Sequence, residues 1–193
     1  MAGMSISLGC IIYMICENKV VGAIAFTLGL FLVLTRGYHL FTGKIAYVVD
    51  NPPSYTLNMF LMWFGNAIGA LITSVLIKAT KLNYLQETAL SITNGKLSQT
   101  VLSAFIMAVF CGFIIYWAVE NFKTNPHETG KYIGMLIMIP IFILCGFEHC
   151  VANMFYFFFS DTYTLKMLLY LVIITLGNTV GSVVLRLLKK HHK

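Results

Sequence analysis

An acid, a histidine and an amide interrupt one long apolar stretch of this chain: Glu148, His149 and Asn153 lie between Tyr132 and Phe159. Ionisable side chains at membrane depth are costly, and they normally face a bundle interior or a water-filled path. An imidazole has an ordinary pKa of about 6.5 and exchanges a proton near neutral pH, while apolar surroundings favour its neutral form. His149 could therefore donate a hydrogen bond or a proton to a small weak-acid anion. The substrate would then cross uncharged and avoid the cost of a bare ion in hydrocarbon.

The sequence indicates a different role for each of three further polar residues. Glu148 would repel an anion, so we expect it to hold backbone amides or the interruption itself in place. Thr42 lies in a second polar interruption and could present its hydroxyl group toward His149. Lys96 would raise the local anion concentration if its loop folded inward, although the residues alone favour a solvated loop lysine. The sequence shows no metal-ligand spacing, and we expect neither a metal nor a cofactor.

The composition is that of an integral membrane protein. Of the 193 residues, 59% are hydrophobic and only 10% are charged, and the mean hydropathy is +0.83. A helix needs about 20 apolar residues to cross the hydrocarbon. We expect an all-α membrane protein forming one transmembrane domain over residues 1–193. Its six helices are predicted at approximately 2–16, 20–49, 55–77, 99–119, 132–159 and 165–187.

The net charge of +6 does not predict a nucleic-acid partner, because four of the thirteen basic residues lie at the C-terminal end of the last predicted helix. Such a group is typical of a membrane-flanking tail on the cytoplasmic side. With an even number of spans, the N-terminus and the 120–131 loop are then cytoplasmic too. The first span lacks the basic start of a signal peptide, so we treat it as retained structure. The four residues are Arg186, Lys189, Lys190 and Lys193; no prediction is made for His191 and His192 beside them.

Short motifs recur in the same order in the two halves of the chain, approximately residues 1–80 and 98–188. Three spans in each half would make the second half enter the membrane from the opposite side. Such an inverted repeat places a functional site near the bilayer midplane, on interrupted helices. The matching pairs are Tyr55–Met59 with Tyr163–Met167, Gly65–Gly69 with Gly177–Gly181, and Gly37–His39 with Gly146–Glu148, the last at an offset of 109 residues.

Polar interruptions at matching places predict that helices two and five are broken. The first runs from Gly37 to Lys44 and the second from Gly146 to Asn153, and we expect Gly37, Gly43 and Gly146 to have structural roles there. Non-helical backbone at membrane depth is tolerated only where it is buried in protein or lines a cavity. The glycine pairs of the third and sixth spans have the spacing that lets helices approach closely, which favours packing within one protomer.

These residues resemble the formate/nitrite transporter family, which also includes hydrosulfide channels. The resemblance covers nearly the whole chain, and the motif of the fifth helix is highly specific. It implies an aquaporin-like protomer of six helices, a homopentamer with one pore per subunit, and passage of small monovalent anions or their acids across the bacterial inner membrane, with both termini cytoplasmic. The motifs are Leu40–Gly43, Phe64–Gly69 and Phe147–Met154.

The resemblance assigns roles residue by residue. His149 corresponds to the central histidine and proton donor of the family, Thr42 to the threonine facing it, and Lys96 to the lysine of the anion path, and we place Asn153 on the same pathway. The remaining positions are hydrophobic constrictions: Phe26 and Leu30 fall where the family has one, and Phe142 falls where it has the other.

Three positions depart from the family pattern. His39 stands where many members carry an acid, Gly112 stands where an asparagine is common in the fourth helix, and Lys44 adds a charge that formate-type sequences lack. These departures bear on substrate selectivity rather than on the fold. We expect a passive or proton-coupled path for formate first, with nitrite, hydrosulfide and short carboxylates as competitors.

Two other classes of function stay open at this point. An intramembrane enzyme could use His149 and Glu148, although the chain has no His-Glu-x-x-His pattern and no paired serine or acid to complete a catalytic set. A pore for neutral solutes would not need an ionisable histidine at its centre. We therefore expect a channel and not an enzyme.

Overall fold

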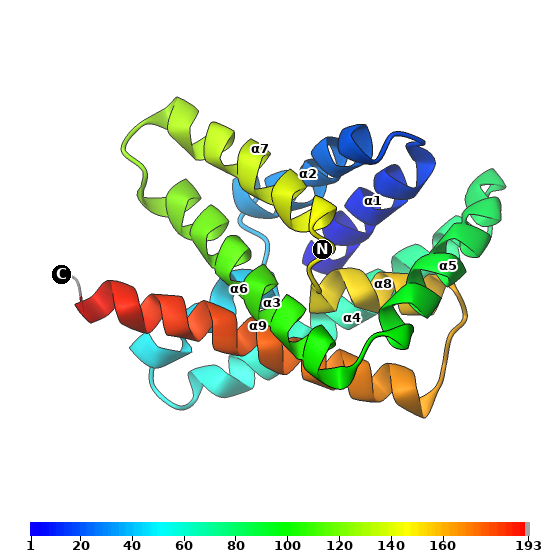
Figure 1. The fold of residues 1–193 in the computed structure, drawn as a ribbon. Coiled ribbons are helices and arrows are strands. Elements are labelled where there is room, and N and C mark those ends of the chain that lie inside the picture. Colours follow the sequence, from blue (N-terminus) through cyan, green and yellow to red (C-terminus); the bar gives the residue numbers. More distant parts are fainter. Residues whose placement is uncertain (192–193) are drawn as a thin grey trace.

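The computed structural model describes residues 1–191, and over this range the chain is helical without a strand (Figure 1). His192 and Lys193, the last members of the basic C-terminal group, lie outside the described residues. The helices are α1 (Ala2–Ile15), α2 (Lys19–Thr35), α3 (Phe41–Lys44), the 3-10 helix η1 (Ile45–Asp50), α4 (Tyr55–Lys78), η2 (Lys81–Tyr84), α5 (Leu85–Ser98), α6 (Val101–Thr124), α7 (Glu128–Leu144), α8 (Cys150–Phe159) and α9 (Leu165–His191).

The molecule has the exposed apolar surface of a membrane protein. Helices α4, α6 and α9 are long and apolar enough to cross a bilayer, and α1, α2 and α8 are shorter apolar helices. Large apolar side chains such as Phe60, Leu61 and Leu168 are more than half exposed on the outer faces of α4 and α9. In a soluble protein such continuous apolar faces would be a liability, whereas in a membrane they contact lipid or neighbouring subunits.

The chain leaves the helical path at both predicted interruptions. Residues 36–40 separate α2 from α3, and residues 145–149 separate α7 from α8. Helix α8 lies in the core, with nine of its ten residues buried. A helix that is apolar all round is stable only when it is enclosed on every side. The polar groups at the start of α8 are therefore held deep inside the protein.

The two halves pack in the same way. Helix α1 packs against α2 and α4, and α6 packs against α7 and α9. At Gly3 of α1 an added Cβ would lie 2.0 Å from the carbonyl oxygen of Asn66, and at Gly112 of α6 it would lie 2.5 Å from that of Asn178. Gly3 and Gly112 are 109 residues apart. Each half thus uses a glycine to bring its first helix against the backbone of its third.

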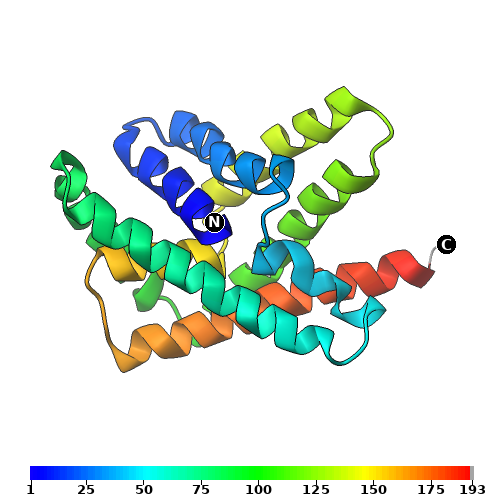
Figure 2. The same ribbon diagram turned by 180° about the vertical axis from the view of Figure 1, so that it is seen from behind.

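The spaced glycines of α4 and α9 confirm, with one exception, the prediction of packing within the protomer. Added Cβ atoms at Gly177 and Gly181 would meet α6, and one at Gly69 would meet α1. At Gly65 there is no atom within 4 Å. The long helices α4 and α9 cross in the view from behind (Figure 2). The indole Nε1 of Trp63 on α4 donates a hydrogen bond to the Thr175 hydroxyl on α9 over 3.1 Å.

The polar segment between α4 and α6 is largely helical. It forms η2 and α5. Helix α5 packs on α8, and Gln86 Nε2 donates a hydrogen bond to the carbonyl oxygen of Phe159 over 3.1 Å. This packing brings Lys96, near the end of α5, toward the core.

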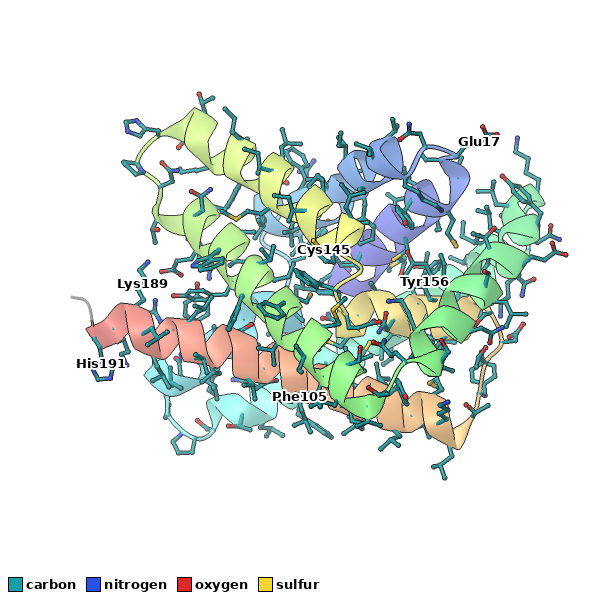
Figure 3. The ribbon with its side chains drawn as sticks, in the orientation of Figure 1. Glu17, Phe105, Cys145, Tyr156, Lys189 and His191 are labelled. Atoms are coloured by element: carbon teal, nitrogen blue, oxygen red, sulfur yellow. The ribbon has the colours of Figure 1, made fainter. Side chains whose placement is uncertain are left out.

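The basic residues at the end of α9 form ion pairs with acids of the protein. Arg186 bonds Asp50 at 2.6 Å and Glu120 at 3.2 Å, Lys189 bonds Glu120 at 2.6 Å, and Lys190 bonds Asp50 at 2.7 Å. Lys189 lies at this end of the molecule in Figure 3. The sequence predicted a membrane-flanking tail here; in the structure these charges also fasten α9 to η1 and α6.

Candidate functional site

The two helix breaks have matching backbone geometry. Gly37 has φ of +67° and Gly146 has φ of +68°, while the residues that cap the following helices, Leu40 and His149, are extended. Glycine reaches the left-handed region without the steric cost that a Cβ atom brings. The roles predicted for Gly37 and Gly146 thus have a local cause, whereas Gly43 lies inside α3 and makes only ordinary contacts.

An asparagine holds each break by its backbone. Asn66 accepts a hydrogen bond from the Phe41 N–H and donates one to the His39 carbonyl oxygen, both at 2.9 Å. Asn178 does the same in the second half: it accepts from the first N–H of α8 at 2.9 Å and donates to the Glu148 carbonyl oxygen at 2.7 Å. Buried peptide groups outside a helix need such partners. The sequence analysis missed these roles, although the recurrence of Gly-Asn-x-x-Gly was the signal for them.

His149 and Thr42 meet where the two breaks face each other. The Thr42 hydroxyl oxygen lies 2.8 Å from His149 Nε2, and both side chains are buried. His149 Nδ1 accepts a hydrogen bond from the Ala152 N–H at 3.1 Å and so caps α8. Because Nδ1 accepts, the neutral ring carries its proton on Nε2 and donates it to Thr42. The Thr42 hydroxyl hydrogen is then directed elsewhere and is a free donor at this point.

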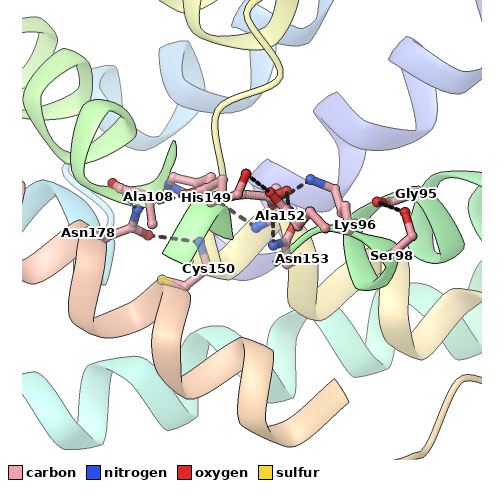
Figure 4. A network of polar contacts seen from close by, with 12 residues as sticks. Gly95, Lys96, Ser98, Ala108, His149, Cys150, Ala152, Asn153 and Asn178 are labelled. Atoms are coloured by element: carbon pink, nitrogen blue, oxygen red, sulfur yellow. Dashed lines mark hydrogen bonds and ion pairs between the residues drawn. The ribbon is translucent and has the colours of Figure 1, made fainter. Parts of the chain in front are cut away.

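Glu148 is buried beside His149 and receives three side-chain donors. Lys96 Nζ, Gln99 Nε2 and Asn153 Nδ2 each lie 2.7 Å from one of its carboxylate oxygens. A buried carboxylate is tolerated when it is paired and fully hydrogen-bonded. Figure 4 shows Lys96 reaching from α5 toward Asn153 at the start of α8. The structure thus turns Lys96 inward and makes Glu148 a bonded, structural acid.

A cavity of about 350 Å³ adjoins this network. We call it the Lys96 cavity; its walls include Tyr13, Phe26, Lys96, Phe142, His149 and Asn153. The Asn153 amide oxygen is buried and has no hydrogen-bond partner among the described residues. It therefore offers an unused acceptor in the same cavity as the ammonium group of Lys96. The ammonium group suits the anionic oxygen of a weak-acid anion, and the amide oxygen suits the acidic proton of the corresponding neutral acid.

Two of the residues predicted to form constrictions lie in contact with each other beside His149. The rings of Phe26 and Phe142 are in edge contact, with centroids 5.8 Å apart, and Phe142 lies 6.1 Å from the His149 ring. Helices α2 and α7 pack together and bring Phe26, assigned to one constriction, and Phe142, assigned to the other, into one aromatic pair. Leu30, one turn further along α2, is also buried.

Two of the three departures lie at the first break. Lys44 Nζ is 2.5 Å from His39 Nδ1, and Lys44 lines a second cavity of about 320 Å³. We call this the Lys44 cavity; its walls also include Val33, Leu40, Gly43, Phe122 and Lys123. Gly112, by contrast, lies at the contact between α6 and α9, where an added Cβ would strike Asn178. Gly112 therefore has a packing role, and its effect on selectivity stays a prediction.

These observations define a class of protein: a helical membrane protein in which two facing helix breaks enclose a polar centre, with a cavity at each break. A comparison with known families makes the assignment specific. The model of the formate/nitrite transporter family matches residues 1–191. The chain therefore belongs to the formate/nitrite transporter family.

Individual relatives and solved structures agree with this assignment. The formate channel FocA of Haemophilus influenzae is 28% identical over 149 residues, covering 72% of this chain and 52% of the relative. A probable formate transporter of Methanothermobacter thermautotrophicus is 29% identical and covers 86% of this chain and 72% of the relative. A pentameric formate channel with formate bound superposes with a TM-score of 0.82 at 25% identity, covering 98% of this chain and 92% of that one.

The chain spans about half the length of several curated relatives it matches. The relatives are channels and transporters rather than enzymes. The alternative of an intramembrane enzyme built on His149 and Glu148 is therefore set aside.

Proposed function

We propose that this protein is a channel for small monovalent weak-acid anions, with formate as the first candidate and nitrite, hydrosulfide or short carboxylates as alternatives. The observation that carries the proposal is the buried hydrogen bond between Thr42 and His149, which stands between facing helix breaks and beside an inward-facing lysine. The formate-channel names of the relatives and the bound formate of the similar structure support this choice.

The path runs through the Lys96 cavity and past the edges of Phe26 and Phe142 to the polar centre. Lys96 attracts the anion, and the paired acid Glu148 keeps the lysine in place. At the centre the anion accepts a hydrogen bond from the free Thr42 hydroxyl, while the unpartnered amide oxygen of Asn153 can accept the proton of a neutral acid. An apolar passage favours the neutral acid, because desolvating a bare charge is costly.

Neutral His149 donates a hydrogen bond through Nε2. It can donate a proton only after Nδ1 has itself been protonated. To give up the proton on Nε2, the ring must take another proton on Nδ1, and Nδ1 is occupied by the Ala152 N–H. Proton transfer to the anion therefore requires that this cap of α8 opens. The ring then returns to neutrality with its proton on Nδ1 instead of Nε2.

The wider architecture is part of the same proposal. The chain makes six spans, of which the second (residues 20–49, with α2 and α3) and the fifth (α7 with α8) are broken, in an aquaporin-like inverted repeat. In this proposal the C-terminal end of α9 faces the cytoplasm, and the protein resides in the bacterial inner membrane. The exposed apolar faces of the long helices fit contacts between subunits of a homopentamer, and a similar solved structure is a pentamer.

The proposal is tested by solute flux into liposomes. Formate, nitrite, hydrosulfide and glycerol are compared for wild type, His149→Ala and the control His127→Ala, which changes an exposed loop histidine, over about pH 5 to 8. We expect formate flux that rises as the pH falls, is lost in His149→Ala and is kept in His127→Ala. Anion flux that ignores both pH and the His149 substitution would overturn the protonation mechanism. Glycerol flux without anion flux would identify a neutral-solute pore instead.

A further inference from the structure

The Lys44 cavity is the repeat counterpart of the Lys96 cavity. Of the ten residues that line it, seven lie 109 positions before a residue lining the Lys96 cavity, and an eighth, Phe122, lies 109 positions after Tyr13. The equivalent pairs include Leu40 with His149 and Lys44 with Asn153. The internal symmetry thus produces two related hollows, one at each break, with the hydrogen bond between Thr42 and His149 linking the two breaks.

The two cavities differ in how their positive charges are balanced. In the Lys96 cavity the ammonium group is paired with the buried carboxylate of Glu148. The position equivalent to Glu148 is His39, whose ring nitrogen accepts a hydrogen bond from Lys44 but carries no negative charge in its neutral form. His39 therefore holds Lys44 in place without neutralising it.

Lys123 adds a second uncompensated charge to the Lys44 cavity. Its ammonium group lies 4.0 Å from the centroid of the Tyr47 ring, and neither Lys123 nor Lys44 forms an ion pair with any described residue. Glu120, one turn earlier on α6, is already bonded to the Tyr47 hydroxyl, Arg186 and Lys189. Two lysines thus face one small cavity in which no carboxylate balances them.

We propose that the Lys44 cavity is a second anion-binding site, in which Lys44 and Lys123 bind a small monovalent anion such as a short carboxylate, with His39 as the residue that positions Lys44. This inference rests on the proposed channel function, since both cavities would lie on one path. In the proposed orientation the Lys44 cavity is the cytoplasmic mouth. It would hold an anion more tightly than the Lys96 cavity, where one lysine is already paired.

The site makes the half-saturating anion concentration differ between the two sides of the membrane. It adds no net driving force in either direction. A passive pore cannot favour one direction at equilibrium, so the permeability at low anion concentration must be the same both ways. The concentration that half-saturates the flux can differ between the two sides. Entry from the Lys44 side should saturate at a lower concentration, because uncompensated positive charge concentrates anions at that mouth.

The experiment uses liposomes in which the channel has one known orientation and formate is added from either side. In the double variant Lys44→Gln and Lys123→Gln, we expect the half-saturating concentration from the Lys44 side to rise about tenfold, with little change from the other side. Low-concentration permeability should fall equally in both directions. Lys44→Arg with Lys123→Arg should restore the wild-type value, and Lys81→Gln, at an exposed lysine without an ion pair, should change nothing.

A substitution at the positioning residue gives an independent check. His39→Glu restores an acid at the position equivalent to Glu148, so it should pair with Lys44 and raise the half-saturating concentration from the same side. His39→Gln keeps a neutral acceptor and should stay close to wild type. Equal effects of Glu and Gln at this position would contradict the charge argument.

A direct binding measurement separates this inference from the channel function. Saturation-transfer NMR of the formate proton, with the protein in nanodiscs, reports binding without transport. Loss of most of the signal in the double glutamine variant supports the site, and an unchanged signal together with unchanged half-saturation overturns it. If the wild-type protein binds formate at these lysines but carries no flux of any tested anion, the channel function fails and the binding site stands.

Discussion

The hydroxyl oxygen of Thr42 and Nε2 of His149 lie 2.8 Å apart, although 107 residues separate them in the chain. Each group stands at the start of a short helix that follows a glycine in the left-handed conformation. Both are buried, so the bond forms only if the two halves of the molecule are correctly packed. Substitutions at this hydrogen bond should therefore affect both the function and the packing of the two halves.

Removing the hydroxyl group should reduce flux without unfolding the protein. Thr42→Val keeps the shape of the side chain but takes away both the acceptor for His149 and the donor for the anion. Hydrogen bonds of this kind are worth about 1 to 3 kcal/mol, so we expect formate flux to fall about tenfold or more. Thr42→Ser should retain most of the flux. Liposome flux assays measure both variants, with the yield of folded protein in detergent as the control.

Replacing the asparagine that holds the second break should destabilise the fold. Asn178→Ala leaves the first N–H of α8 and the carbonyl oxygens of Glu148 and Ala108 without this partner. Each buried unsatisfied group costs about 1 to 3 kcal/mol, so we expect a clear fall in the thermal unfolding midpoint in detergent. Asn58→Ala, on the exposed face of α4, is the matched control. A midpoint equal to that of the control would show that Asn178 does not support the break.

Gly146 and Gly65 both have open space around them, so substitutions there report the effect of backbone conformation on stability without an effect of side-chain packing. Neither Gly146 nor Gly65 has an atom within 4 Å of an added Cβ, but only Gly146 has a positive φ. Gly146→Ala should therefore destabilise the protein by about 1 to 2 kcal/mol. Gly65→Ala, inside helix α4, should be neutral or stabilising by up to about 1 kcal/mol. Thermal unfolding of both variants under the same conditions tests the difference, and equal shifts would contradict it.

Neutralising the buried acid should change binding and stability in opposite directions. Glu148→Gln leaves Lys96 with an uncompensated charge in a part-buried position, which should lower the unfolding midpoint because breaking a buried pair by removing one partner is costly. The free lysine should at the same time bind formate more tightly in the NMR experiment. Lys96→Met combined with Glu148→Gln should recover part of the stability and lose the extra binding. If Glu148→Gln alone bound formate more weakly than the wild-type protein, this role for Lys96 would be contradicted.

The ion pairs that join the C-terminal end of α9 to Asp50 in η1 should weaken in acid. Lys190 and Arg186 hold the pKa of the Asp50 carboxyl group below its ordinary value. Because the folded pKa is depressed, the stabilisation is complete above the unfolded pKa of about 3.9 and is lost as the pH falls through the folded value. Hydrogen exchange of η1 should accelerate in that acidic range for wild type. Asp50→Asn should show fast exchange already at neutral pH, and an η1 segment insensitive to both changes would contradict the prediction.

The sequence predicted the parts of the site whose signal is local. Gly37 and Gly146 stand out because few residues other than glycine suit a turn at those positions, and His149 stands out because a titratable group is rare in an apolar run. The internal repeat then indicated that the two breaks correspond. The inward turn of Lys96 could not be read from its polar surroundings; it was expected only from the family resemblance, and the structure gives the cause in its bond to Glu148.

What the sequence did not predict depends on contacts between distant segments. The edge contact of Phe26 with Phe142 follows from the packing of α2 on α7, and nothing in either helix alone indicates it. Asn66 and Asn178 were visible as repeated residues, but their partners are peptide groups 25 to 70 residues away. The anchoring of Arg186 by Asp50 joins residues 136 positions apart. Such pairings are decided by tertiary geometry.

The backbone repeat has a consequence for the origin of the polar centre. The residue of the second half equivalent to Thr42 is Val151, and the residue of the first half equivalent to His149 is Leu40. A symmetric pairing of two first halves would set threonine against leucine, and a pairing of two second halves would set histidine against valine. Only the pairing of one first half with one second half places a hydroxyl group opposite an imidazole. The chemistry of the centre therefore belongs to the single fused chain, and neither half could supply it by dimerising with itself.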